Sequence, residues 1–522
     1  MVITFNNLKN YIVNDPILDW LDIYGEKNLY KKDSKINYFN FLLKKSNEFK
    51  IDSLENLLSK IRIKYSFINK KTIIYKNNLN KDFYTNLFIV NNNLQTTIDL
   101  VLSEKIAKNL FKVSNNNNKY YIVKFAYFSG KCNKYGILSN NHKHILLKYR
   151  IHFDYNLIKS KNYNISPNII IIFKNIKNSN KNWIIYNISQ DNTLYYKKTL
   201  KKSIKWYKFI STKGDKINLN EKNIRILKLY PNMKNTNDYP WSNSKIIIAK
   251  KYKEITLIWN LNYKDRNDII KNYNVNTWDK LEINMINKST EKKKIIEGII
   301  NINKSPTSII NYIINNNDLL SNFDKEIYLD YEVLTDIFTE DFNMKSNFVF
   351  MIGALFVDNK KSSFKFRYYL VENISNKSEK KIFNNLIKDI IIFTENKQIP
   401  VYHWGDIENY IYKNIKTKYN IKYNIRFIDL NRILKKNNIY IKDCFNYSLK
   451  NVGNALYNNN IIQTRWDSNI SNGIEAMLEY YYVYKKNYNE NIIDIIRYNY
   501  VDVKILHEIN SWLKTILIEK NI

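Results

Sequence analysis

Acidic residues stand at spacings that could hold a metal ion in the C-terminal part of this 522-residue chain. Asp330 and Glu332 lie two apart in residues 326–333, a run dominated by apolar and aromatic residues. This pattern predicts a strand with both carboxylates on one face. Burying them is costly unless a cation holds them, and a divalent ion is the usual partner of such oxygen ligands. The alternative is a strand near its end with two solvated acids.

Two later stretches offer further acids. Residues 403–408, His-Trp-Gly-Asp-Ile-Glu, lead from a predicted strand into a predicted helix, so Asp406 or Glu408 could lie near the mouth of a sheet. For Asp406 we favour a helix-capping role. Tyr498 and Asp502 are four residues apart in a long predicted helix, so they share one face. Isoleucines and leucines surround them, which predicts partial burial of both.

The elements that would position these acids alternate in a regular order. Strands are predicted at 326–333, 348–356, 364–370, 399–403 and 426–430, with helices at 378–395, at 406–416 and towards the end of the chain. Three meander strands followed by alternating helices and strands predict a mixed α/β sheet with helices packed on it. At the strand ends, we expect His403 to be structural and Asp429 to cap the following turn.

The composition favours a polyanionic partner. A formal net charge of +35 is large, although a Lys- and Asn-rich composition also suggests drift in an A+T-rich genome. Lysine and arginine attract phosphate backbones through counterion release, and no basic amphipathic membrane anchor stands out. Nucleic acid is therefore the expected partner, DNA before RNA, and no membrane contact is expected.

The chain has the features of an intracellular protein. Its two cysteines, Cys132 and Cys444, fall in segments that look like separate domains, which argues against a disulfide scaffold and a Cys-ligated zinc site. The N-terminus lacks a signal-peptide pattern, and the apolar runs are too short to span a bilayer. We expect a soluble protein of the cytoplasm or nucleus. Its oligomeric state stays open.

The acids match a known pattern. Asp330-x-Glu332, then residues 403–408, then Tyr498-x-x-x-Asp502 resemble the tyrosine subclass of DEDD exonucleases in the ribonuclease H-like superfamily, with Glu408 at the place of the usual Asp. More closely, residues 323–522 resemble the ribonuclease H-like domain of predicted RecB-family nucleases. The supporting features, in chain order, are Asp429-Leu430, Tyr447-Ser448-Leu449-Lys450, Trp466, Gly473 and the final Tyr-Asn-x-x-Asp-Val helix.

The resemblance implies a catalytic site with two Mg²⁺ or Mn²⁺ ions, about 3.5–4 Å apart in such sites. Asp330 would hold both ions, and Glu332, Glu408 and Asp502 would complete the ligand shell. Tyr498 would orient the attacking water. The implied activity is 3′–5′ exonuclease cleavage of DNA. The alternative is a non-catalytic nucleic-acid-binding protein in which both nuclease folds are degenerate.

The N-terminal part resembles a PD-(D/E)xK nuclease. Asp99 and Lys124 fit the strand Asp and the Lys of that motif. However, Ile122 stands where the second acid belongs, Lys50 where the helix Glu belongs, and Arg150 at a later Gln position. One aspartate with a lysine in place of a carboxylate is a poor Mg²⁺ site. We therefore predict a nuclease fold that has lost its metal site and is kept for nucleic-acid binding or architecture.

Three domains are expected. Residues 1–225 would form the PD-(D/E)xK-like α/β domain, 226–322 a helical connector, and 323–522 the ribonuclease H-like domain. Within the connector, residues 254–261 are predicted to form an apolar helix, residues 262–266 a turn and residues 267–273 a second helix. This order resembles a helix-hairpin-helix, which is able to bind phosphates at a helix N-terminus. A plain helical linker is the alternative, because the expected hairpin glycines are absent.

Overall fold

The structure is a computed structural model. In it the chain folds into two compact units, Met1–Glu254 (unit 1) and Ile255–Ile522 (unit 2). It describes residues 1–33, 37–61, 72–73, 79, 81–113, 119–131, 138–139, 141–176, 179–191, 193–219, 226–311, 323–339, 347–467, 470, 472–486 and 492–518. Cys132 lies outside these residues, whereas Cys444 is a free, buried thiol. No helix in the described ranges is long and apolar enough to cross a membrane.

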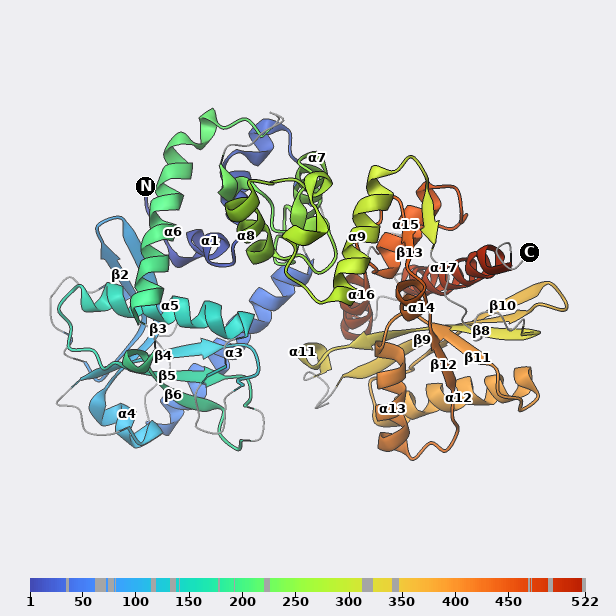
Figure 1. Ribbon diagram of the computed structural model, residues 1–522. Helices are drawn as coiled ribbons and strands as arrows, with labels where there is room; N and C mark the ends of the chain where they lie inside the picture. The colour runs from blue at the N-terminus through green and yellow to red at the C-terminus, as the bar shows by residue number, and fades with distance from the viewer. Residues whose placement is uncertain are drawn as a thin grey trace. The chain divides into compact units, whose positions relative to one another are not determined.

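Unit 1 is built on a six-stranded mixed sheet in the order β1-β2-β3-β4-β5-β6 (Figure 1). The strands are β1 (Thr72–Ile73), β2 (Phe83–Asn91), β3 (Leu94–Ser103), β4 (Tyr120–Ala126), β5 (Asn168–Phe173) and β6 (Trp183–Asn187). Strands β2, β3 and β4 form an antiparallel meander, and β5 runs parallel to β4. That parallel step requires a crossover, which helix α5 supplies.

Helices cover both faces of the unit 1 sheet. They are α3 (Asn37–Lys60), α4 (Glu104–Phe111), α5 (His142–Lys159) and α6 (Thr193–Lys213). Side chains of α5 and α6 share one apolar cluster with one face of the sheet, and side chains of α3 and α4 share a second cluster with the other face. The six strands therefore have a core on each side, as α/β domains do.

The start of the chain packs against residues from the predicted connector. Helices α1 (Lys9–Ile12), α2 (Ile17–Trp20) and α7 (Ser242–Lys251) contribute to a third apolar cluster in unit 1. This cluster buries Trp20, Trp206 and Trp241 together. The segment 226–322, predicted as a connector, is thus divided, because its first part belongs to unit 1 and its remainder to unit 2.

The helix predicted over residues 254–261 was wrong. Only a 3₁₀ turn, Ile255–Leu257, forms there, and α8 (Tyr263–Tyr273) begins after it. The run is buried or partly buried throughout, Glu254 and Thr256 included, so periodicity could not separate a buried turn from a helix. Asn262 starts α8 by accepting hydrogen bonds from the backbone N–H groups of Lys264 and Asp265. Helix α9 (Thr290–Lys304) follows, then β7 (Ile309–Asn311), which pairs with β13 (Ile439–Ile441).

Unit 2 contains a five-stranded mixed sheet in the order β10-β9-β8-β11-β12. The strands are β8 (Lys325–Leu334), β9 (Phe348–Asp358), β10 (Ser363–Leu370), β11 (Pro400–His403) and β12 (Arg426–Asp429). Strands β10, β9 and β8 are antiparallel neighbours, while β11 runs parallel to both β8 and β12. The predicted mixed α/β fold class is confirmed, and the five predicted strands lie within two residues of their expected bounds.

The helices of unit 2 lie on both faces of this sheet, with α12 and α13 on one face and α16 and α17 on the other (Figure 1). Their bounds are α11 (Asp336–Thr339), α12 (Asn376–Thr394), α13 (Ile407–Tyr419), α14 (Leu430–Lys436), α15 (Leu449–Asn458), α16 (Gly473–Lys486) and α17 (Ile492–Ile518). Alternation along the central strand β8 sends Tyr331 against Phe383 of α12. Its neighbours Asp330 and Glu332 consequently point to the α17 face.

Candidate metal centre

Three carboxylates meet between β8 and α17. Asp330 and Glu332 come from the central strand, and Asp502 comes from the helix that crosses it. One carboxylate oxygen of each residue lies within 4.8 Å of the others. In the part of the chain that the structure describes, this is the only group of three or more acidic, His or Cys ligands so arranged. The predicted pairing of the β8 acids with Asp502 is thus present in the structure.

Burial and mutual repulsion make these carboxylates hard to ionise. Glu332 is 5% exposed and Asp502 6% exposed. Burial, followed by the charge of Asp502, raises the pKa of Glu332 to about 8. Burial likewise raises the pKa of Asp502 to about 6, and burial with the charges of the neighbouring acids raises that of Asp330 well above its ordinary value. Desolvation and like charge disfavour the ionised form, and a bound cation would relieve both.

An asparagine next to the predicted tyrosine holds the two strand acids. The Asn499 side-chain amide donates to Asp330 Oδ2 at 2.9 Å and to Glu332 Oε1 at 3.4 Å. Gly353 of β9, paired with Asp330, makes room for it, because a Cβ on Gly353 would lie 1.5 Å from Asn499 Oδ1. A side chain at position 353 would therefore displace Asn499. The glycine is required by this close approach.

Asp502 is oriented by two ring-bearing donors. Trp466 Nε1 donates to Asp502 Oδ1 at 2.7 Å, and the Tyr498 hydroxyl donates to the same carboxylate. The Lys450 ammonium lies 4.9 Å from the centre of the Tyr498 ring and 5.7 Å from that of Trp466. Burial and the neighbouring carboxylates raise the pKa of Tyr498 far above its ordinary range, so its phenol stays protonated at neutral pH.

Glu408 lies near the centre but outside the three-carboxylate group. It is buried in the first turn of α13, and its charge contributes to the raised pKa of Asp330. Its Oε2 lies 3.1 Å from Nδ1 of the buried His403. His403 therefore contacts a candidate ligand, in keeping with its predicted structural role. A side-chain rotation of Glu408 would have to break this contact before it could join the other acids.

The two remaining acids at the strand ends differ from each other. Asp429 accepts hydrogen bonds from the backbone N–H groups of Gly405 and Asn431, at 2.8 and 2.9 Å, which confirms the predicted cap. The capping role predicted for Asp406 was wrong. It occupies the position before α13, but its side chain accepts no capping hydrogen bond there. Its backbone has helical dihedrals, which turn the side chain away from the first helical N–H groups, and it lines a pocket of about 250 Å³ instead.

The donor set fits a hard divalent cation. Each of the three groups offers carboxylate oxygens, which suit Mg²⁺, Mn²⁺ and Ca²⁺ rather than the softer metals. Among the described residues, none of the three acids forms an ion pair with a lysine or arginine side chain. Asn499, Trp466 and Tyr498 also give the group the second layer of hydrogen bonds that orients metal-binding carboxylates.

The predicted residues of unit 1 also come together, but they form ion pairs. Lys124, 5% exposed on β4, lies 2.9 Å from Asp99 Oδ2, and Lys50 of α3 lies 2.8 Å from Asp99 Oδ1. Although burial opposes it, these two ammonium groups hold the pKa of Asp99 at about 2. Ile122 is buried two residues before Lys124, where the resemblance expects an acid.

A second acid completes this network. Asp154 of α5 lies 3.1 Å from the Lys124 ammonium, and Arg150 Nε lies 3.1 Å from both of its oxygens. The hydroxyl of Thr96 donates to the same carboxylate at 2.6 Å. Both acids are thus neutralised by side chains of the protein itself. This arrangement does not fit a divalent cation, because the cationic side chains already occupy the carboxylate oxygens.

Residues other than the predicted acids also build the centre of unit 2. Asn499 could have been assigned from its spacing, because it stands three residues before Asp502 and shares its side of a helix. The resemblance singled out Trp466 and Lys450, but no spacing connects them to Asp502, since their places relative to it depend on tertiary packing. Gly353 stands in an apolar strand, where a lone glycine marks either a bulge or a close backbone approach.

Comparison with known families agrees with this geometry. Residues 333–514 match the sequence model of the RNase_H superfamily, so unit 2 carries an RNase H-like domain. The match includes Glu408, Tyr498 and Asp502 and begins just after Glu332. No curated protein and no solved structure matches the chain. An RNase H-like fold is a nuclease-type fold, generally metal-dependent and acting on nucleic acid.

Proposed function

We propose that the chain is a metal-dependent nuclease that hydrolyses phosphodiester bonds in unit 2, as an exonuclease acting on DNA from the 3′ end. The observation that carries the proposal is the meeting of Asp330, Glu332 and Asp502 within 4.8 Å, the first partly buried and the other two buried, and none of them ion-paired among the described residues. Such a group binds hard cations, and clustered carboxylates of this kind are the usual holders of the ions in phosphodiester hydrolysis.

The chain's own residues would have distinct tasks. Asp330, Glu332 and Asp502 would hold Mg²⁺ or Mn²⁺, with two ions at full occupancy, and Glu408 would join them on leaving His403. A bound divalent ion would supply a water of lowered pKa and stabilise the leaving oxygen. Asn499 would keep the two strand acids in place.

Tyr498 would act as a hydrogen-bond donor. Its pKa is raised by burial and by the adjacent acids, so the phenol would not serve as the general base. Its hydroxyl is directed at Asp502, which places a neutral donor beside the ion-binding oxygens. From there it would orient the attacking water.

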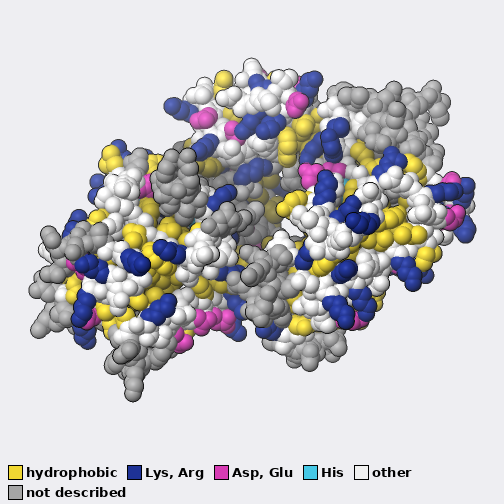
Figure 2. Space-filling view, turned by 90° about the horizontal axis from the view of Figure 1, so that it is seen from below, with side chains coloured by type: hydrophobic (Ala, Val, Ile, Leu, Met, Phe, Trp, Pro, Cys, Tyr) yellow, Lys and Arg dark blue, Asp and Glu magenta, His cyan; other side chains and the backbone are white. Residues whose placement is uncertain are grey.

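The polarity and the substrate follow from the resemblance and the charge. The Tyr-x-x-x-Asp spacing is that of the tyrosine subclass of DEDD exonucleases, which supports 3′–5′ polarity. A net charge of +35 supports a polyanionic substrate. Figure 2 supports this as well, since Lys and Arg side chains are spread over the visible face while acidic side chains are confined to a few small groups.

For unit 1 we propose a PD-(D/E)xK-like fold without a metal site. The order α3, β2, β3, β4, α5, β5 supports this, as does the contact of Lys50 with Asp99 at the place where a ligand would be expected. Its contribution would be nucleic-acid binding or architecture.

Label release from oligonucleotides tests the nuclease proposal. Single- and double-stranded DNA and RNA, each labelled at the 3′ or the 5′ end, are incubated with Mg²⁺ or Mn²⁺, and with a chelator. We expect metal-dependent release of 3′-terminal nucleotides from DNA. Asp330→Asn should abolish it, whereas Asp324→Asn, six residues earlier and exposed beside Lys360, should leave the rate unchanged.

The outcomes separate the two candidate functions. Binding of DNA without cleavage under every metal condition would favour the non-catalytic alternative. Cleavage that persists in both Asp330→Asn and Asp502→Asn would show that the active site does not include these carboxylates. Release from the 5′ end, lost in both variants, would keep the site and correct the polarity.

A further inference from the structure

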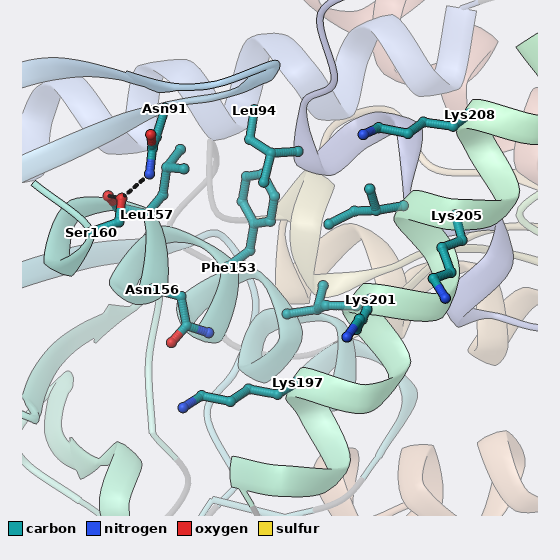
Figure 3. A pocket seen from close by; sticks show the side chains of 12 residues that line it. Asn91, Leu94, Phe153, Asn156, Leu157, Ser160, Lys197, Lys201, Lys205 and Lys208 are labelled. Carbon is teal, nitrogen blue, oxygen red and sulfur yellow. Dashed lines mark hydrogen bonds between the residues drawn. The ribbon is translucent and has the colours of Figure 1, made fainter.

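A row of lysines borders a groove in unit 1 (Figure 3). Lys197, Lys201, Lys205 and Lys208 extend from α6 along one wall. Their spacing of four, four and three residues places them on one side of the helix. The row is about 16 Å long at the rise of an α-helix. All four are exposed, and within the described ranges none forms an ion pair.

The floor of the groove is apolar. It is lined by Leu94, Phe153, Leu157, Leu200 and Ile204. The cavity measures about 450 Å³, and its opposite rim carries the polar residues Asn91, Asn156 and Ser160. Asn91 donates to Ser160 at 2.6 Å, and none of the described residues that line the groove is acidic (Figure 3). The groove therefore combines positive charge along one wall with an apolar floor.

Two properties of a ligand follow from this lining. The lysine row, free of carboxylates, attracts a polyanion whose charges repeat along a line. The cavity has the volume of a small-molecule pocket, so a flat apolar group of a ligand can be buried against its apolar floor. A single strand of nucleic acid presents phosphates and unstacked base faces together, whereas a duplex keeps its base faces stacked inside.

We propose that this groove binds single-stranded nucleic acid, with phosphates along the α6 lysines and one or two bases on the apolar floor. Phosphates of one duplex strand are about 3.4 Å apart along the axis and further apart in an extended strand, so the row can meet roughly three to five of them. The proposal rests on residues of unit 1 alone. It stands or falls independently of the acids in unit 2.

Fluorescence anisotropy of the full chain tests the lysine wall. The probe is a fluorescein-labelled 20-nucleotide oligo-dT, with the matching duplex as comparison, in chelator so that no strand is hydrolysed. Lys201→Gln/Lys205→Gln removes two groove charges. Lys198→Gln/Lys202→Gln removes two exposed charges from the same helix outside the groove lining, and circular dichroism checks that both variants keep their helix content.

We expect the wild type to bind the single strand more tightly than the duplex. The groove variant should lose about tenfold in affinity, and its slope of log affinity against log salt should fall by about 1.4, the value for two lost single-strand phosphate contacts. The variant with changes outside the groove should lose clearly less. Equal losses in the two variants, or equal binding of duplex and single strand by the wild type, would overturn the proposal.

The apolar floor is tested separately. Ile204→Gln should weaken binding of the single strand and leave duplex binding unchanged, because only unstacked bases would reach the floor. Leu194→Gln, exposed on the same helix outside the groove, is its control and should change neither. Stronger competition by polyglutamate or by phosphatidylserine vesicles than by unlabelled oligo-dT would assign the groove to another ligand and refute a nucleic-acid site.

Discussion

Each unit gathers acidic side chains beside its sheet, but the Asp99 group of unit 1 is ion-paired with lysines whereas the Asp330 group of unit 2 is not, among the described residues. Asp99 lies between Lys50 and Lys124, and its pKa stays at about 2. Glu332 lies beside Asp330 and Asp502 and forms no ion pair with any lysine or arginine that the structure describes, and its pKa rises to about 8. Carboxylates beside the two sheets thus have pKa values shifted in opposite directions.

The difference shows what separates a structural ion-pair network from a metal centre. A carboxylate that an ammonium group of the same chain neutralises has no free oxygen and no excess charge to attract an ion. A group of acids lacking such a partner is unstable in its ionised form, and this instability is relieved when a divalent cation binds. In unit 1, Lys124 and Lys50 together neutralise Asp99.

The largest effect should come from breaking the unit 1 network. Lys124→Met would leave the buried Asp154 and the partly buried Asp99 with too few cations, so the free energy of unfolding should fall by about 3–5 kcal/mol. Urea denaturation measures it. Lys105→Met, exposed on α4, is the control and should change it by less than about 0.5 kcal/mol. Equal stability of the two variants would show that Lys124 is not needed to neutralise Asp99 and Asp154.

Metal binding should stabilise the chain through unit 2 alone. With Mn²⁺ at 100 times its dissociation constant, the free energy of unfolding should rise by about 2.7 kcal/mol. Asp502→Asn should remove this gain. Asp99→Asn changes an aspartate of the degenerate site in unit 1 and should keep the gain. Thermal unfolding with and without metal provides the measurement. A gain that disappears with Asp99→Asn would reverse the roles assigned to the two units.

Positioning of the acids should matter less than the acids themselves. Asn499→Ala removes the donor to Asp330 and Glu332, and we expect metal affinity to fall roughly 10–100-fold. Gly353→Ala should do the same by displacing Asn499. Isothermal titration with Mn²⁺ measures both, with the exposed Asn454→Ala as control. Normal affinity in Gly353→Ala would show that Asn499 is not needed.

The smallest effect is a gain of stability without metal. Glu332 has a folded-state pKa of about 8, above its ordinary value of 4.5, so its ionisation costs nothing at low pH and destabilises the folded state as pH rises towards 8. In chelator, Glu332→Gln should therefore raise the free energy of unfolding by roughly 1–3 kcal/mol at pH 8 and by little at pH 4. Denaturation at the two pH values checks this. Destabilisation at pH 8 would contradict the excess of negative charge.

Local patterns predicted the C-terminal fold well. The strands of unit 2 alternate or run apolar over lengths typical of strands, and Asp429 stands where a cap is needed, so local chemistry identified both. The i, i+2 and i, i+4 spacings likewise identified Asp330 with Glu332 and Tyr498 with Asp502. These features depend on residues close together in sequence.

The rest depended on contacts that span long stretches of chain. The Trp466 hydrogen bond to Asp502, and the clearance between Gly353 and Asn499, arise only when separate elements pack. The contact of Glu408 with His403 joins residues five apart in sequence. Whether Glu408 can reach the metal site, however, depends on how α13 packs relative to β8. The turn at 255–257 was missed because a mostly apolar run that is buried throughout has no exposed face to mark a helix.

Helix α17 contacts β8 over much of its length. Asn499 bonds to Asp330, Asn510 donates to the Tyr328 hydroxyl at 2.8 Å, and Lys514 pairs with Glu326. Because these partners are separated by well over a hundred residues in the chain, β8 leaves the ribosome long before the helix that completes its acids. Nascent or prematurely terminated chains lacking α17 would accordingly carry Asp330 and Glu332 without Asp502, and so an incomplete metal centre.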